Sequence, residues 1–214
     1  MTMSNMSGSS LYSLKQQSLS MAKDLSAATK TVTDAVTIYA NENESVSSML
    51  NKAQPTVLLS AASGMSSSSS ADAIQGILNQ FNLSEDQAMH VADTVEKLSS
   101  EIALDFSKGC DTISQSIATS GSVVNEAGMS FEKYAALVST TAEKTRVSGS
   151  QIGNAFKTIF SRISRSKDGL TTDAEMSDAE AALKSVGVSV RRADGDLRDI
   201  SDTLDDLNKV CIMQ

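Results

Sequence analysis

Apolar residues near the N-terminus recur at alternating steps of three and four. The positions are Leu11, Leu14, Met21, Leu25, Ala28, Val32, Ala35 and Tyr39, with Ser18 as the one polar exception. This spacing forms a heptad seam, which is typical of an extended helix packed against a partner helix in the same chain or in another. It predicts an extended heptad helical arm over 11–59, preceded by a disordered N-terminus at 1–10. Such an arm also offers a surface for self-association.

The serine-rich segment SAASGMSSSSSA at 60–71 interrupts this pattern. Serine side chains compete for backbone hydrogen bonds, and the run has no apolar face. Two interpretations fit it. The segment is either a flexible linker between the arm and a compact helical domain at 72–210, or a frayed helix junction inside one domain.

Helix-start signals follow the serine run. Ser84, Ser148 and Ser177 are each followed three residues later by Gln or Glu, which is the pattern of a capping box. Ser130 precedes an apolar run that contains Phe131 and Tyr134. Repeated starts of this kind favour several short packed helices. The expected fold class is therefore all-α, a multi-helix bundle with an extended N-terminal heptad helix.

The stretch SGSQIGNAFKTIFSRISRSK at 148–167 carries a clear apolar stripe. Its apolar members fall within about 140° of the helix circumference at 100° per residue. They are Ile152, Ala155, Phe156, Ile159, Phe160 and Ile163. The stripe predicts a core face, and we expect it to pack with Phe131 and Tyr134 between helices. The basic residues of the stretch then belong to the solvated side.

Gly153 lies one turn inside this predicted helix, four residues after Gly149. Glycine inside a helix costs about 1 kcal/mol relative to alanine. We therefore expect a neighbouring segment to pack closely against Gly153 and count it among the helix-packing residues.

Composition agrees with a helical chain. Of 214 residues, 40% are hydrophobic and 4% aromatic, and Pro55 is the single proline, so little interrupts helices. The formal net charge of −8 counts against a nucleic-acid partner, because such proteins usually present a basic surface. No apolar run approaches the ~18 residues that a membrane span needs.

Residues suited to catalysis or metal binding are sparse. His90 is the only histidine, and Cys110 and Cys211 are far apart and fit no metal-ligand spacing. No glycine-rich phosphate loop follows a strand. The sequence predicts no catalytic residue, no metal and no cofactor, and therefore a protein that is not an enzyme.

Three segments together resemble a known family. They are FNLSEDQAMHVADTVEKLS (81–99), AGMSFEKYAALVSTTAEKTRVSGSQIGNAFKTIFSRISR (127–165) and AALKSVGVSVRRADGDLRDISDTLDDL (181–207). Read in this order, they resemble the conserved-domain region of tail tape measure proteins of tailed bacteriophages. The similarity runs through roughly 34–207, and the middle segment is the most specific.

The resemblance implies a helical structural protein that occupies the lumen of the tail tube, sets tail length during assembly and is released during genome ejection. It implies tail-tube subunits, tail-tip proteins and tail assembly chaperones as partners. The expected location is the virion tail, and the host cytoplasm during assembly. The resemblance carries over no catalytic residue.

Two features set the chain apart from the family. Members usually continue for hundreds of residues beyond this region, whereas this chain ends at VCIMQ. Even as one continuous helix the chain would reach only ~320 Å at 1.5 Å per residue. The expectation is a fragment, a truncated prophage gene or a split tape measure protein.

A helical signalling or filament module, chemoreceptor-like or flagellin-like, is the alternative function. Such modules share Ser- and Ala-rich heptads with few prolines, but they keep one heptad register over long stretches. The repeated capping boxes here favour a compact bundle instead.

Overall fold

The computed structural model describes residues 7–40, 45–102, 105–164, 178–195 and 198–212. Within these residues the secondary structure is helical and there is no sheet, which confirms the all-α class. In chain order the helices are α1 (Gly8–Asp24), α2 (Thr29–Ala40), α3 (Val46–Ser63), α4 (Ser67–Gln80), α5 (Ala88–Glu101), α6 (Phe106–Glu126), α7 (Phe131–Thr145), α8 (Gly149–Ser164), α9 (Asp178–Ser185) and α10 (Ile200–Ile212), with a 3₁₀ turn η2 (Glu85–Gln87) before α5.

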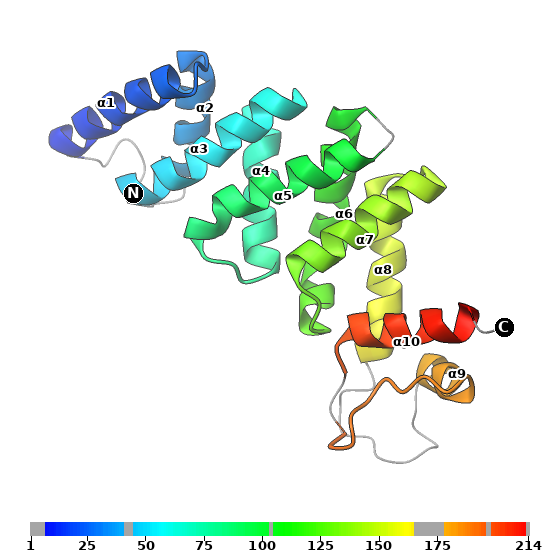
Figure 1. The fold of residues 1–214 in the computed structure, drawn as a ribbon. Coiled ribbons are helices and arrows are strands. Elements are labelled where there is room, and N and C mark those ends of the chain that lie inside the picture. Colours follow the sequence, from blue (N-terminus) through cyan, green and yellow to red (C-terminus); the bar gives the residue numbers. More distant parts are fainter. Residues whose placement is uncertain (1–6, 41–44, 103–104, 165–177, 196–197, 213–214) are drawn as a thin grey trace.

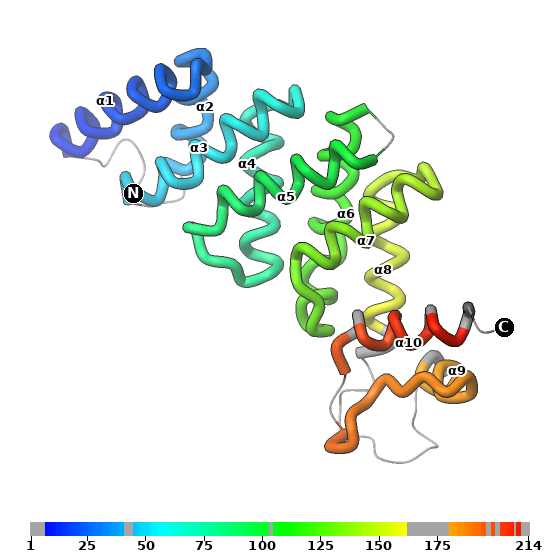
Figure 2. The backbone as a smooth tube through the Cα atoms, in the orientation of Figure 1, coloured from blue at the N-terminus to red at the C-terminus, as the bar shows by residue number. Residues whose placement is uncertain are grey.

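The first eight helices form four successive helix pairs, α1–α2, α3–α4, α5–α6 and α7–α8, stacked side by side (Figure 1). The odd-numbered helices contact one another in order and make one layer, and the even-numbered helices make a second layer. Each pair therefore packs mainly on the pairs next to it in sequence, as in an α-solenoid. The tube in Figure 2 follows this course from α1 at one end of the stack to α9 and α10 beside the other.

Two clusters of buried side chains hold the stack together. The N-terminal cluster joins α1, α2 and α3 through residues such as Leu14, Val36 and Met49, and it reaches α4 at Ala71. The larger cluster runs from Leu59 through α4 to α8. Helix α4 thus contributes to both clusters and joins the two halves of the stack.

The heptad arm is not one extended helix, so that prediction is wrong. The seam is divided between α1 and α2, and α1 ends where Ser26 takes a left-handed backbone with φ of 50°. The Ala27 amide donates to the Ala22 carbonyl at 2.9 Å, which closes the helix end as a Schellman motif does. The seam residues of the two helices, such as Leu14 and Val32, then meet in the same core cluster.

Helix α1 also begins inside the segment predicted to be disordered. Ser7 is its N-cap, and the Ser7 side chain accepts a hydrogen bond from the Ser10 amide at 3.2 Å. Residues 8–10 are therefore helical. Residues 1–6 lie outside the described part of the chain.

The serine-rich segment is a helix junction, the second of its two interpretations, and the flexible linker is wrong. Helix α3 continues through Pro55 to Ser63 and ends at Gly64, where φ is 72°. Ser66 then caps α4, its side chain accepting from the Ser69 amide at 3.0 Å. The serines at 67–70 form the first turn of α4, because a serine at the N-cap replaces the backbone bonds that a helix start lacks.

Candidate interaction surfaces

The described packing residues of α8, apart from Ile159, and Tyr134 of α7 lie at the junction of α6, α7 and α8. The ring of Phe131, also on α7, lies 5.8 Å from that of Phe81 at the end of α4. The predicted packing residues that are buried in the described structure are Ile152, Gly153, Phe160, Phe131 and Tyr134, and Phe156 is partly buried against the same core. Ile159 is 47% exposed, so its assignment to the core is wrong. The side chain of Ile163 lies outside the described residues.

The glycine side of α8 makes the close contact with α6. A Cβ atom added to Gly153 would lie 2.7 Å from the Thr119 Cβ and 2.8 Å from the Ser116 carbonyl oxygen. A Cβ atom on Gly149 would overlap the Thr112 carbonyl oxygen. The buried face of α8 is therefore turned by roughly 50° from the middle of its apolar stripe at 100° per residue. This rotation leaves Ala155, at the far edge of the stripe, and Ile159, the next residue in from that edge, exposed to solvent, so the assignment of both to the core face is wrong.

Tyr134 of α7 is the centre of an aromatic group in this junction. Its ring packs edge-on against the rings of Phe156 and Phe160, with centroids 5.6 and 6.3 Å away. Its hydroxyl forms hydrogen bonds with Ser116, at 3.0 Å, and with Ser120, both on α6. Burial raises the pKa of Tyr134, although the two serines oppose the shift. The phenol stays neutral and fixes α7 against α6, which is a structural role.

Two of the three predicted capping boxes can be placed. The Ser84 amide donates to the Gln87 Oε1 at 3.2 Å ahead of α5. The Ser148 amide donates to the Gln151 Oε1 at 3.2 Å, and the Gln151 amide donates back to the Ser148 hydroxyl at 3.4 Å. Ser177 lies outside the described residues.

The single histidine forms a surface hydrogen bond between neighbouring helix pairs. His90 Nε2 on α5 lies 2.8 Å from Glu132 Oε1 on α7, and both side chains are about half exposed, at 52% and 47%. Partial burial raises the pKa of Glu132, but the hydrogen bond with His90 and bonds from its own amide and Ser130 lower it further, and the net pKa is below the usual value. The pair links α5 to α7 at the surface.

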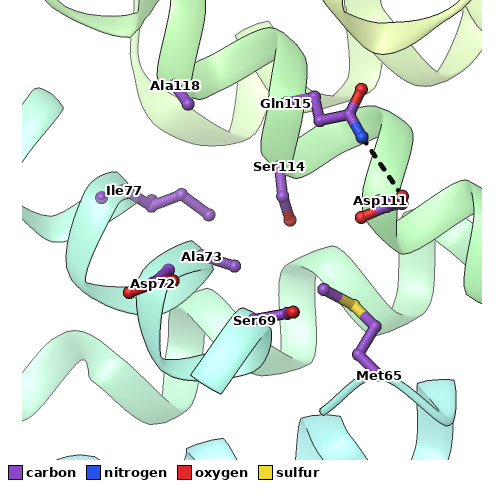
Figure 3. Close-up of a pocket in the computed structure, with 10 residues that line it drawn as sticks. Met65, Ser69, Asp72, Ala73, Ile77, Asp111, Ser114, Gln115 and Ala118 are labelled. Atoms are coloured by element: carbon purple, nitrogen blue, oxygen red, sulfur yellow. Dashed lines mark hydrogen bonds between the residues drawn. The ribbon is translucent and has the colours of Figure 1, made fainter. Parts of the chain in front are cut away.

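A shallow groove of about 220 Å³ separates α4 from α6. Figure 3 shows Ser114 of α6 reaching into this space toward Ala73 and Ser69 of α4. The Ser114 hydroxyl has no hydrogen-bond partner among the described residues. Asp111 at the edge accepts a hydrogen bond from the Gln115 amide group at 3.2 Å. The groove is a gap between packed helices, and its two carboxylates come from different helices, Asp72 of α4 and Asp111 of α6.

A second groove lies between α1 and α2. We call it the end groove. Its volume is about 260 Å³, and its apolar lining comes from Leu11, Leu14 and Leu19 of α1 and from Val36 of α2. Leu14 and Val36 are almost fully buried and form its floor, while Leu11 and Leu19 are 44% and 42% exposed. The end groove is thus an apolar surface open to solvent.

Metal-binding and membrane-spanning features were sought in the described residues. No group of three or more His, Cys, Asp or Glu side chains there could hold a metal ion. None of the helices described is both long and apolar enough to cross a bilayer. Cys110 is buried, and this burial raises the pKa of its thiol, so the reactive thiolate is disfavoured.

Comparison with known proteins gives consistent matches. The sequence model of a family described as "Phage-related minor tail protein" matches residues 15–211. A protein named "Probable tape measure protein", from Escherichia phage P2, is 24% identical over 190 residues. The match covers 89% of this chain and 22% of that protein, so the chain spans about a fifth of the length of this relative. No solved structure matches.

Proposed function

The chain belongs to the phage-related minor tail protein family, and from this membership we propose that it acts as a segment of a tape measure protein. In this role it occupies the lumen of the tail tube, takes part in setting tail length during assembly, and is released during genome ejection. The observation that carries the proposal is the family match, which runs through nearly all of the chain, from residue 15 to residue 211. The similarity to the probable tape measure protein of phage P2 supports it.

The proposed role is structural and non-enzymatic. The side chains that the structure brings together are hydrophobic packing residues, such as Phe131 and Phe160, and the single histidine pairs with Glu132 at the surface. The partners we propose are tail-tube subunits, tail-tip proteins and tail assembly chaperones. The location we propose is the virion tail, with the host bacterial cytoplasm as the site of assembly.

The alternative, a chemoreceptor-like or flagellin-like coiled coil, has less support. It requires one apolar register over a long helix, whereas the longest helix in the described ranges, α6, has 21 residues. Both the ends of the helices and the side-by-side stacking of the pairs disagree with a long two-stranded coil.

Tail length provides the test. In the phage or prophage that carries the gene, the α3–α4 pair (46–80) would be duplicated in frame and the tails measured by electron microscopy. If the segment lies in the tube as one helix, about 35 added residues lengthen the tail by ~50 Å at 1.5 Å per residue. If the stacked pairs persist, the increase is about 10 Å, the spacing of packed helices.

A matched control distinguishes the effect of added chain length from the effect of changing the sequence of the α3–α4 pair. The substitution Gly76→Ala lies in the same α3–α4 pair and changes no length, so its tails should equal those of the parent. Peptides of the chain should also be found by mass spectrometry in purified tails. Unchanged tail length in the duplication, or absence of the chain from intact tails, would contradict the proposed function.

A further inference from the structure

Lys52 of α3 is the one charged side chain of α1–α8 that is fully buried in the described structure, with 0% of its surface exposed. Its ammonium group donates to the Gln75 Oε1 of α4 at 2.9 Å and lies 4.6 Å from the centre of the Tyr39 ring of α2. The Tyr39 hydroxyl forms a hydrogen bond with the Thr56 hydroxyl of α3 at 2.7 Å. These four residues form a polar cluster where α2, α3 and α4 meet, which we call the lysine layer.

The lysine layer lies among small apolar side chains. Besides Tyr39, helix α2 contributes only valines and alanines to the N-terminal core cluster. The junction of α6, α7 and α8 differs in both respects. There Tyr134 packs against the rings of Phe156 and Phe160, and its hydroxyl bonds to neutral serines. The contact of α2 with α3 and α4 therefore combines modest apolar surface with a buried charge.

A buried ammonium group weakens the contact that encloses it. The cost of removing its water can exceed what its new contacts return, and this holds for an ion pair as well as for a single charge. When α2 separates from α3, water reaches the Lys52 amine, while the bond from Lys52 to Gln75 stays within the α3–α4 pair. The lysine layer therefore favours the separated state more than an apolar core of the same size would.

We propose that the lysine layer is a separation plane, at which the α1–α2 pair opens from the stack while α5 to α8 stay folded. Proteins open locally in cooperative units that differ in free energy. In stacked repeats each pair contacts mainly its neighbours, so one interface can open without the others. The plane lies between described helices and does not depend on what adjoins α1. It also does not rest on the proposed tail function.

Hydrogen exchange of the native full chain, followed by mass spectrometry at one pH, measures this opening helix by helix. Lys52→Met replaces the ammonium group with an apolar side chain, so the amides of α2 should exchange about fivefold more slowly than in the parent, or slower still. The amides of α7, whose buried residues belong to the larger cluster, should keep the parent rate. The matched control is Lys97→Met, the same change at an exposed position of α5, which should alter neither helix.

Gln75→Met should change the exchange rate in the opposite direction. This variant removes the acceptor of the Lys52 ammonium group but leaves the charge buried, so the amides of α2 should exchange about tenfold faster than in the parent. The double variant Lys52→Met/Gln75→Met removes the charge together with its acceptor and should exchange more slowly than Gln75→Met.

The outcomes that overturn the proposal are distinct from these. Faster exchange of α2 or loss of folding in Lys52→Met would mean that the lysine layer stabilises the contact. An unchanged rate in α2, or an equal change in α7, would mean that the layer does not control a local opening. The amides of α2 should already exchange faster than those of α7 in the parent, and equal protection of the two helices would also exclude a separation plane.

Discussion

Replacing Gly153 by alanine tests the contact between α6 and α8 most directly. Alanine favours a helix over glycine by about 1 kcal/mol, so propensity alone predicts a more stable protein. The new Cβ, however, would lie 2.7 Å from the Thr119 Cβ and 2.8 Å from the Ser116 carbonyl oxygen. Carbon atoms in contact prefer about 3.5–4.0 Å. The Ser116 oxygen belongs to the backbone of α6, so it cannot turn away, and the two helices must separate.

The expected net effect is a loss of up to about 2 kcal/mol in the free energy of unfolding, which is the overpacking cost less the propensity gain of about 1 kcal/mol. Overpacking of this kind typically costs about 1–3 kcal/mol, and the separation of α8 from α6 also loosens the packing of Phe160. For a chain of this size each kcal/mol corresponds to about 2–4 °C in melting temperature. Gly153→Ala should therefore melt up to several degrees below the parent, with the same helical signal at low temperature.

Gly76 supplies the matched control. It also lies inside a helix, α4, but a Cβ added there would meet nothing within 4 Å. Gly76→Ala should therefore show the propensity gain alone and melt at a higher temperature than the parent. Thermal unfolding followed by circular dichroism at 222 nm, a wavelength that reports α-helix, measures all three proteins. A Gly153→Ala protein as stable as Gly76→Ala would refute the close contact between α6 and α8.

Four further variants, of which Ile159→Ala is a control, test the junction and the surface pair. Phe160→Ala removes a ring that is 1% exposed and should lower the free energy of unfolding by about 3–5 kcal/mol. Ile159→Ala, on the same helix but 47% exposed, should lower it much less. Equal losses would contradict the assignment of Phe160 to the buried face of α8 and of Ile159 to the exposed one. Tyr134→Phe removes the hydroxyl that forms hydrogen bonds with two serines of α6. The free energy of unfolding, measured with urea, should fall by about 1–3 kcal/mol. An unchanged urea midpoint would mean that these hydrogen bonds do not stabilise the fold. Because the pKa of Glu132 is lowered in the folded protein, its contribution is present above the usual glutamate pKa and is lost as pH falls through the lowered one. Melting curves between about pH 6 and 3 should show a smaller acid loss in Glu132→Gln than in the parent, and identical pH profiles would count against the His90 pair.

Local signals in the sequence located the helices well. Serine followed three residues later by glutamine marks the start of η2 at Ser84 and of α8 at Ser148, and both boxes have their reciprocal polar contacts. These features depend on residues within one helical turn of each other. A single sequence therefore contains all the information that determines them.

Two of the predictions that failed, the single heptad helix and the core position of Ala155 and Ile159, have a physical cause in common. The end of α1 depends on Ser26 in a left-handed conformation, which glycine or asparagine would have signalled and serine does not. The buried face of α8 depends on two glycines, which a hydrophobic stripe does not count as apolar. The spacing of Gly149 and Gly153 was the available signal, because two small residues one turn apart permit close approach of another backbone. The glycine spacing does not show, however, that α6 is the helix that packs against α8.

The stacking of helix pairs cannot be predicted from short-range sequence patterns. It nevertheless explains why many of the seam residues are buried although the predicted single helix is wrong. Contacts run mostly between successive pairs, so dividing the predicted arm into α1 and α2 changes which helix meets the seam. Most of the seam residues are still buried or partly buried, whereas Leu11 and Ala28 are exposed. Leu14 and Tyr39, chosen from the heptad pattern, are 2% and 0% exposed. A heptad seam indicates only that a helix packs against an apolar neighbour, and does not indicate which one. In this chain a turn at Ser26 folds the seam back on itself, and the neighbour is the next helix along.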